Sequence, residues 1–224
     1  MSDPERDDPH AGQPVRTAGT PLTEARAAVI MVHGRGASAE SILTLAPAVG
    51  VTGVAFLAPQ AGGNQGRQWY PLSFMAPIER NEPGISSGLR AIERLLAQVG
   101  AAGIPPEKTL FLGFSQGACL ASEFVARHAR RYGGLAVLSG ALIGPDETPR
   151  DYPGSLDGTP VFLGCSDVDS HIPAGRVKES AEVLQRLGGE VTVRLYPGMG
   201  HMVNDDEIDT VRALVLGAVT QRGT

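Results

Sequence analysis

The sequence predicts an α/β fold in which a mostly parallel sheet is covered by helices on both faces. Short apolar runs bounded by Gly or Pro alternate with longer runs of helical periodicity along the 224 residues. This alternation is typical of three-layer α/β proteins. Neither an internal repeat nor a linker-like stretch divides the chain. We therefore expect a single domain over residues 15–224, preceded by a disordered acidic tail over residues 1–14.

Seven apolar runs are predicted to be strands. Each is short and dominated by apolar residues, as strands buried on both faces of a parallel sheet are. Their expected bounds are 15–18, 28–33, 54–58, 109–114, 135–139, 160–165 and 191–196.

Four stretches place apolar residues at helical spacing and are predicted to be helices. Their expected bounds are 85–99, 118–130, 177–187 and 206–219. Ser86 or Ser87 is expected to cap the first of them, and Gly100 to end it. Acidic residues open the last one, which suits the dipole of a helix.

Composition excludes several classes of protein. The net charge of −5 gives no basic surface for nucleic acid. No apolar run approaches the roughly 20 residues of a membrane span. The acidic N-terminus lacks the apolar core of a secretory signal, so we expect a cytoplasmic protein. Cys119 and Cys165 are not in a metal-binding spacing and are expected to be buried free thiols.

The pentapeptide Gly113-Phe114-Ser115-Gln116-Gly117 stands where a predicted strand meets a predicted helix. A Gly-x-Ser-x-Gly in that setting is typical of the nucleophile elbow of an α/β-hydrolase, which lifts a serine hydroxyl above the sheet. A serine hydroxyl is a poor nucleophile at neutral pH. It needs a base within hydrogen-bond reach, and the base needs an acid that fixes its tautomer.

Three histidines follow Ser115 in the order that this fold requires. His128 falls on the predicted helix after the elbow and is expected to be a surface residue. His171 lies only two residues from Asp169, too near to act with it from a separate loop. His201 lies in a glycine-rich loop between the last strand and the last helix, so it is the predicted base.

Two carboxylates, Asp167 and Asp169, follow the predicted strand 160–165, and spacing alone leaves both open as the acid. The oxyanion hole needs two backbone N–H donors. One is predicted from Gln116, directly after the nucleophile. The other is predicted from Arg35 or Gly36, in the glycine-rich loop after strand 28–33. His33 is expected to be structural and to hold that loop.

Four motifs together resemble the phospholipase/carboxylesterase family of α/β-hydrolases, which includes the acyl-protein thioesterases. They are Met31-Val32-His33-Gly34-Arg35-Gly36, Leu112-Gly113-Phe114-Ser115-Gln116-Gly117-Ala118, Asp169-Ser170-His171-Ile172-Pro173 and Tyr196-Pro197-Gly198-Met199-Gly200-His201. The resemblance runs from about residue 27 to the C-terminus. It implies Asp169 as the acid, because the family's carboxylate stands three residues before a Val-Pro step. It also supports the oxyanion role of Gln116.

The chain departs from the family in its oxyanion loop, where Arg35-Gly36-Ala37 replaces the common Leu-Gly-Asp. This departure affects the choice of substrate more than the reaction. The segment 60–83 fits no regular element and corresponds to a loop that lines the acyl site in the family. We therefore consider two interpretations, a substrate pocket or simple packing onto the core, for its apolar residues Trp69, Tyr70, Leu72, Phe74 and Met75.

The sequence thus predicts a metal-independent, cofactor-free serine carboxylesterase that acts through an acyl-enzyme on small to medium acyl esters. A thioesterase or lysophospholipase acting on long acyl chains is the alternative, and a non-catalytic binding protein on a hydrolase scaffold is a remote one. The expected partner is a small-molecule ester, without nucleic acid or a membrane span. A homodimer is possible.

Overall fold

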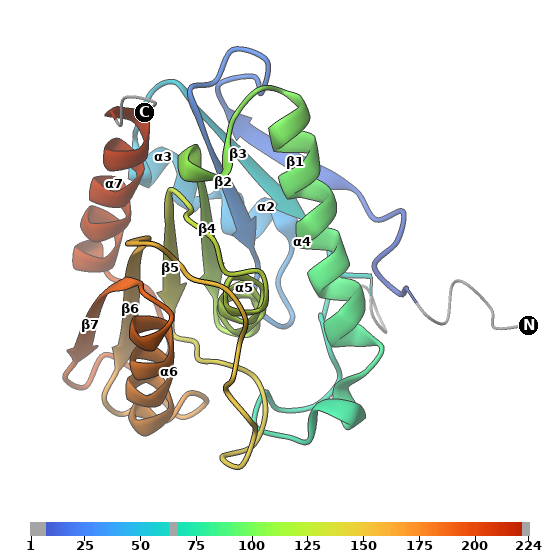
Figure 1. Cartoon of the computed structure of the whole chain (residues 1–224), viewed down its shortest axis with the longest axis vertical. Helices are drawn as coiled ribbons and strands as arrows, with labels where there is room; N and C mark the ends of the chain where they lie inside the picture. The colour runs from blue at the N-terminus through green and yellow to red at the C-terminus, as the bar shows by residue number, and fades with distance from the viewer. Residues whose placement is uncertain (1–7, 63–66, 221–224) are drawn as a thin grey trace, which may run out of the picture.

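The computed structural model describes residues 8–62 and 67–220. In these residues seven strands form one sheet in the order β1-β3-β2-β4-β5-β6-β7 (Figure 1). β1 pairs antiparallel with β3, and all other neighbours are parallel. The strands are β1 (Val15–Gly19), β2 (Ala27–Val32), β3 (Val54–Pro59), β4 (Thr109–Phe114), β5 (Gly134–Leu138), β6 (Pro160–Ser166) and β7 (Glu190–Tyr196). The carboxyl ends of β2, β4, β6 and β7 therefore share one edge.

Helices cover both faces of the sheet. α4 (Gly84–Ala101), α5 (Gln116–Arg127) and α6 (Ala174–Arg186) contribute to one apolar cluster. α2 (Ala39–Leu43), α3 (Leu45–Val49) and α7 (Asp205–Thr220) contribute to the other. Successive strand residues point to opposite faces, so Phe111 of β4 lies in the first cluster and Leu112 in the second. The predicted three-layer α/β architecture is confirmed.

The predicted strands all begin and end within one residue of the observed ones. The predicted helices are found with ends that differ by one to three residues. α2 and α3 were not predicted because five residues are too few to show helical periodicity. The short 3₁₀ turns η2 (Ile78–Asn81) and η3 (Pro106–Lys108) were not predicted either. Among the described residues, no helix combines the length and the hydrophobicity that a membrane span requires.

The predicted serine cap of α4 is wrong. The helix already begins at Gly84, so Ser86 and Ser87 lie within its first turn, and it runs past Gly100 to Ala101. The Ser87 hydroxyl instead binds the N-terminal segment, where it accepts the His10 N–H at 3.0 Å and donates to the Asp8 carboxylate.

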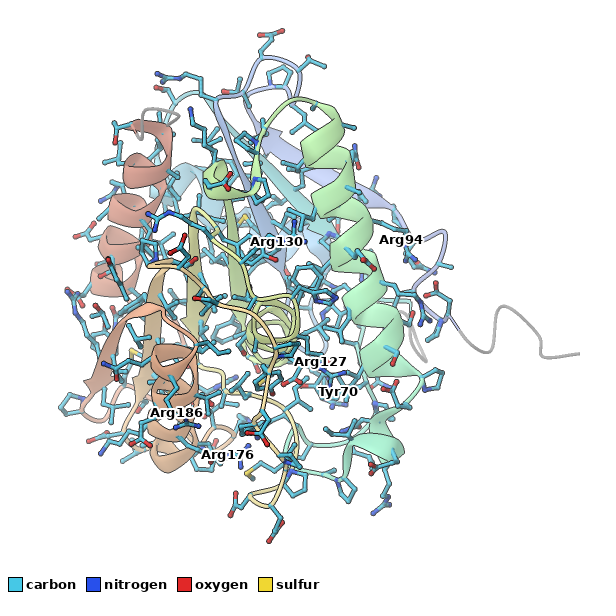
Figure 2. The ribbon with its side chains drawn as sticks, in the orientation of Figure 1. Tyr70, Arg94, Arg127, Arg130, Arg176 and Arg186 are labelled. Atoms are coloured by element: carbon cyan, nitrogen blue, oxygen red, sulfur yellow. The ribbon has the colours of Figure 1, made fainter. Side chains whose placement is uncertain are left out.

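Residues 8–14 are not the disordered tail that the sequence predicts; residues 1–7 lie outside the described residues. The Asp8 carboxylate pairs with Arg94 at 3.1 Å and with Arg90 at 3.3 Å, and Figure 2 shows Arg94 on α4 beside this segment. The buried His10 ring bonds the Trp69 carbonyl at 2.9 Å and accepts the Gly62 N–H at 2.8 Å. The partners in these contacts are 50 or more residues apart along the chain, so the acidic composition of the segment does not predict them.

Candidate active site

Ser115 occupies a strained turn between β4 and α5, with φ 54° and ψ −121°. The glycines on both sides are required because backbone approaches them closely. A Cβ on Gly113 would lie 2.4 Å from the Gly117 carbonyl oxygen, and one on Gly117 would lie 2.1 Å from that of Val32. A non-glycine residue held at positive φ is costly and is typical of functional turns. The local geometry is that of a nucleophile elbow.

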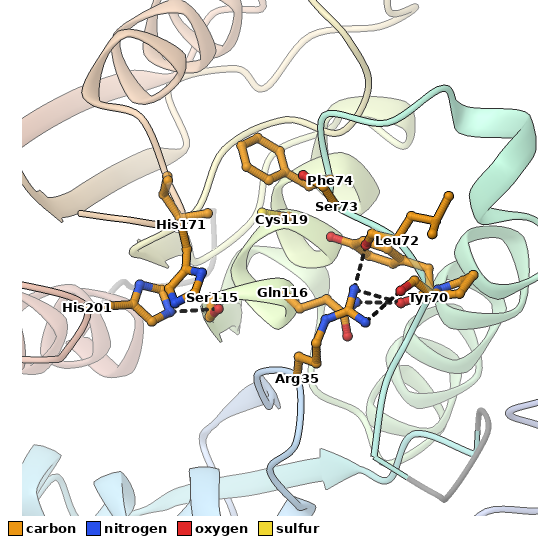
Figure 3. A pocket seen from close by; sticks show the side chains of 12 residues that line it. Arg35, Tyr70, Leu72, Ser73, Phe74, Ser115, Gln116, Cys119, His171 and His201 are labelled. Carbon is orange, nitrogen blue, oxygen red and sulfur yellow. Dashed lines mark hydrogen bonds between the residues drawn. The ribbon is translucent and has the colours of Figure 1, made fainter. Parts of the chain in front are cut away.

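The structure brings Ser115, His201 and Asp169 together from three different loops. His201 Nε2 lies 2.9 Å from Ser115 Oγ, and its Nδ1 lies 2.7 Å from Asp169 Oδ2. With the Nδ1 proton donated to the carboxylate, Nε2 is free to accept the serine proton. Figure 3 shows His201 and Ser115 joined at the edge of a cavity. The three side chains have the connectivity of a hydrolytic triad.

The Asp169 carboxylate is buried, and protein hydrogen-bond donors take the place of water around it. Its Oδ1 accepts the backbone N–H groups of His171 at 2.8 Å and Ile172 at 3.0 Å. Burial opposes ionisation, but the hydrogen bonds from His201 and from these two amides outweigh it and hold the pKa of Asp169 below its usual value. The Asp169 carboxylate is therefore ionised at neutral pH.

Asp167, which spacing alone left open as the acid, serves the neighbouring loop. Its Oδ1 accepts the Gly198 N–H at 2.8 Å, and the Ser166 hydroxyl accepts the Gly200 N–H at 3.1 Å. Both bonds fix the loop that carries His201. Asp167 thus supports the histidine from outside, whereas Asp169 contacts its ring.

Among the described residues, the rings of the other histidines form no hydrogen bond with the side chains of Ser115, His201 or Asp169. His33 is fully buried, and its ring bonds the Gly34 carbonyl at 2.9 Å and accepts the Ala61 N–H at 3.1 Å, so its expected structural role is supported. His128 ends α5, where its ring stacks on Phe124. The His171 ring packs edge-on against that of His201, with centroids 4.8 Å apart.

One of the predicted oxyanion donors is corrected. The Gly36 N–H donates to the Arg67 carbonyl at 2.7 Å, so it is not available to a substrate. The Arg35 N–H donates to none of the described residues, and the Gln116 N–H stands in the first turn of α5, where amides have no intrahelical acceptor. Arg35 and Gln116 remain the candidate pair.

Beside Ser115 lies a cavity of about 400 Å³ (Figure 3). Of the predicted pocket residues, Tyr70, Leu72 and Phe74 line it, whereas Trp69 and Met75 do not. Trp69 is fully buried beneath the wall. Its indole N–H donates to the His33 carbonyl at 2.8 Å, which satisfies the one polar atom of the buried ring. Met75 is 38% exposed and stands outside.

The sequence reasoning missed several residues of the cavity wall. Cys119, His171 and Ile172 line it, together with Pro71 and Ser73. Cys119 could have been found, because it lies four residues after Ser115 and so faces the same side of α5. Burial raises the pKa of its thiol to about 12, which keeps it neutral. Both cysteines are buried free thiols, as predicted.

The lining residues that the structure describes include no Asp or Glu. Arg35, His171 and His201 are the ionisable nitrogen bases among them. Among the described residues, no group of three or more His, Cys, Asp and Glu side chains has the arrangement of a metal site.

Glu207 supports the start of α7, just after the loop of His201. Asn204 and Glu207 exchange hydrogen bonds at 2.9 Å, each side chain accepting the other's backbone N–H, in the manner of a capping box. The second carboxylate oxygen of Glu207 is buried beside Gly164 with no hydrogen-bond partner among the described residues. Burial raises the pKa of Glu207 to about 7.

Comparison with known proteins agrees with this geometry. The chain matches the profile of the Phospholipase/Carboxylesterase family over residues 18–215. A phospholipase/carboxylesterase from Dyadobacter fermentans has a similar crystal structure, with 40% sequence identity and a TM-score of 0.86, covering 92% of this chain and 97% of that one.

Named relatives in other organisms include carboxylesterases and thioesterases. A probable carboxylesterase from Oryza sativa is 30% identical over 92% of this chain and 85% of its own length. Acyl-protein thioesterase 1 from Gibberella zeae is 34% identical over 61% of this chain and 60% of its own length.

The strand order, the elbow and the profile match point to the same group of ester and thioester hydrolases. The chain has the α/β-hydrolase fold and belongs to the phospholipase/carboxylesterase family.

Proposed function

We propose that the protein is a serine carboxylesterase that cleaves small to medium acyl esters through an acyl-enzyme. The observation that carries this proposal is the unbroken path from Ser115 Oγ to His201 Nε2, at 2.9 Å, and from His201 Nδ1 to Asp169 Oδ2, at 2.7 Å. Both distances are within the range of direct proton transfer.

In the proposed reaction, His201 accepts the Ser115 proton as the hydroxyl oxygen attacks the ester carbonyl. Asp169 stabilises the resulting imidazolium, and the backbone N–H groups of Gln116 and Arg35 bind the oxyanion. The tetrahedral adduct collapses as His201 protonates the departing alcohol. Water then attacks the acyl carbonyl and gives a proton to His201. The second tetrahedral adduct collapses as His201 returns that proton to Ser115 Oγ, and the carboxylic acid leaves.

The size of the cavity supports small to medium acyl groups. Its volume of about 400 Å³ lies near the lower end of the range for small-molecule pockets, about 300–1,000 Å³. The buried rings of Tyr70 and Phe74 form part of its wall. A thioesterase acting on a long acyl chain is the alternative, favoured by the similarity to the acyl-protein thioesterase.

The test is a series of p-nitrophenyl esters from acetate to palmitate, together with acyl thioesters of the same lengths. We expect kcat/KM to be greatest for the shorter oxygen esters and to be lost in Ser115→Ala. A maximum at palmitate, or a preference for thioesters, would favour the alternative. Turnover of no substrate in the series would favour a non-catalytic protein on a hydrolase scaffold.

The expected cytoplasmic location, independence of metal and cofactor, and homodimer stay predictions. Sedimentation of the purified chain would determine its oligomeric state, and activity after dialysis against a chelator would test the independence of metal.

A further inference from the structure

The side chain of Arg35 reaches across the cavity mouth to a distant segment of the chain. Its Nη1 donates to Gln68 Oε1 at 2.9 Å and to the Pro71 carbonyl at 2.8 Å, and its Nη2 donates to the carbonyls of Tyr70, at 3.0 Å, and Leu72. Figure 3 shows the guanidinium group directed at this segment. All four acceptors are uncharged, so the bonds fix the guanidinium without neutralising its charge.

Gln116 binds the same segment from the other side of the site. Its side-chain oxygen accepts the Trp69 N–H at 2.8 Å, and its side-chain nitrogen donates to the Tyr70 carbonyl at 2.8 Å. The Tyr70 carbonyl thus accepts from both Gln116 and Arg35. An amide oxygen has two lone pairs, and both are used here.

These contacts join the candidate oxyanion hole to the cavity wall. The two candidate oxyanion donors, Arg35 and Gln116, are the two residues whose side chains hold residues 68–72. Two further bonds connect the same loops, from the Trp69 indole to the His33 carbonyl at 2.8 Å and from the Gly36 N–H to the Arg67 carbonyl at 2.7 Å. Oxyanion donors act only if they are held in place before charge develops.

We propose that Arg35 is a positioning residue whose guanidinium group sets the oxyanion hole against the cavity wall. This inference rests on the proposed esterase function. Lysine cannot replace it, because its three donors radiate from one nitrogen and cannot span four acceptors, whereas the planar guanidinium group can. Loss of the guanidinium group should weaken binding of the transition state more than binding of the ester itself.

The test compares wild type, Arg35→Lys and Arg35→Ala on p-nitrophenyl butyrate, with Arg16→Ala as the matched control. The Arg16 side chain forms an exposed ion pair with Glu40 at 2.6 Å, on a strand away from the cavity. We expect kcat to fall about 100-fold in both Arg35 variants with KM changed less than about threefold, because small displacements of reacting groups have effects of that size. Arg16→Ala should match wild type.

Chemical rescue separates positioning from a general loss of structure. Methylguanidinium should increase the activity of Arg35→Ala at least about tenfold. Methylammonium at the same concentration should not, because only the planar guanidinium group reproduces the fork of donors. Wild-type kcat in Arg35→Lys, or an effect confined to KM, would overturn the proposal. A fall in the activity of the Arg35 variants that is seen only with esters carrying a carboxylate would also overturn it, because the positive charge of Arg35 would then act in binding the substrate.

Amide hydrogen exchange tests the positioning role of Arg35 without relying on esterase activity. If wild type cleaves no ester, the esterase proposal fails, and exchange at residues 67–72 still tests the contact. We expect the Trp69 amide to lose protection in Arg35→Lys and to keep it in Arg16→Ala. Unchanged protection in Arg35→Lys would overturn the positioning role.

Discussion

The two sides of the candidate site are held in different ways. On the triad side, β6 and β7 are adjacent parallel strands, and the loops that follow them fix each other through contacts such as the bond from the Gly198 N–H to Asp167. On the wall side, residues 67–74 form no regular element and are held by side chains, by Arg35 and Gln116 from distant loops and by Asn81 from the turn that follows. Parallel strands of one sheet place the three triad side chains, whereas polar side chains outside the sheet hold the cavity wall.

The largest effect is expected from the triad side. Ser115→Ala should lower kcat for p-nitrophenyl butyrate by about 10⁴-fold or more, because the nucleophile is removed while the fold is kept. Steady-state kinetics and a thermal unfolding curve check both parts. Retained turnover in a folded variant would place the nucleophile elsewhere.

The two neighbouring carboxylates should differ strongly. Asp169→Asn should lower kcat by about 10³- to 10⁴-fold, because a neutral amide no longer fixes the required tautomer of His201. Asp167→Asn keeps an oxygen that can accept the Gly198 N–H and should change kcat by less than about tenfold. Steady-state kinetics on both variants measure this difference. A larger fall in kcat for Asp167→Asn than for Asp169→Asn would make Asp167 the acid.

At Asn81, a wall-side residue outside the candidate oxyanion loop, we expect effects on binding and stability. The buried Asn81 accepts the Leu72 N–H at 2.8 Å and donates to the Ser73 carbonyl at 2.9 Å. Asn81→Ala should lower the free energy of unfolding by about 1–3 kcal/mol, because two backbone groups lose their partners. It should raise KM more than it lowers kcat. Urea unfolding and kinetics test this, and a fall in kcat like that of Asp169→Asn would erase the contrast between the two sides.

Acid should loosen the wall side first. Burial holds the pKa of His10 and of His33 below the usual 6.5. Below that pH these histidines bind protons more readily in the unfolded chain than in the folded chain. The free energy of unfolding therefore decreases as the pH is lowered. The fall is up to about 1.4 kcal/mol per pH unit for each histidine.

Urea unfolding between pH 7 and pH 5 measures this slope, and His10→Gln, which can still donate to the Trp69 carbonyl, should flatten it. An unchanged slope in that variant would show that His10 does not contribute.

The smallest effect is expected from Glu207, behind the triad side. Its folded-state pKa of about 7 lies above the ordinary 4.5. The folded chain therefore binds the extra proton, and stability falls as pH rises from about 4.5 to 7 and stays lower above that. Glu207→Gln should raise the free energy of unfolding at pH 8 by about 1 kcal/mol, with little gain at pH 4. A loss of stability at pH 8 would mean that the charged carboxylate is needed.

Sequence reasoning predicted the triad side better than the wall side, for a physical reason. Ser115, Asp169 and His201 each follow a strand, and parallel strands bring their carboxyl ends to one edge, so order along the chain suffices. The bond between Gly36 and Arg67, the burial of Trp69 and the anchoring of His10 depend on partners that no spacing rule connects. The same holds for the guanidinium group of Arg35, whose four acceptors lie 33 to 37 residues further along the chain.

The most direct test of the account is to find which residue a fluorophosphonate probe modifies. Wild type, Ser115→Ala and Asp169→Asn are treated with the probe and digested, and the modified peptide is identified by mass spectrometry. We predict one modification, on Ser115, that forms much more slowly in Asp169→Asn and is absent in Ser115→Ala. Modification of another residue, or ester hydrolysis that survives in folded Ser115→Ala, would contradict the account.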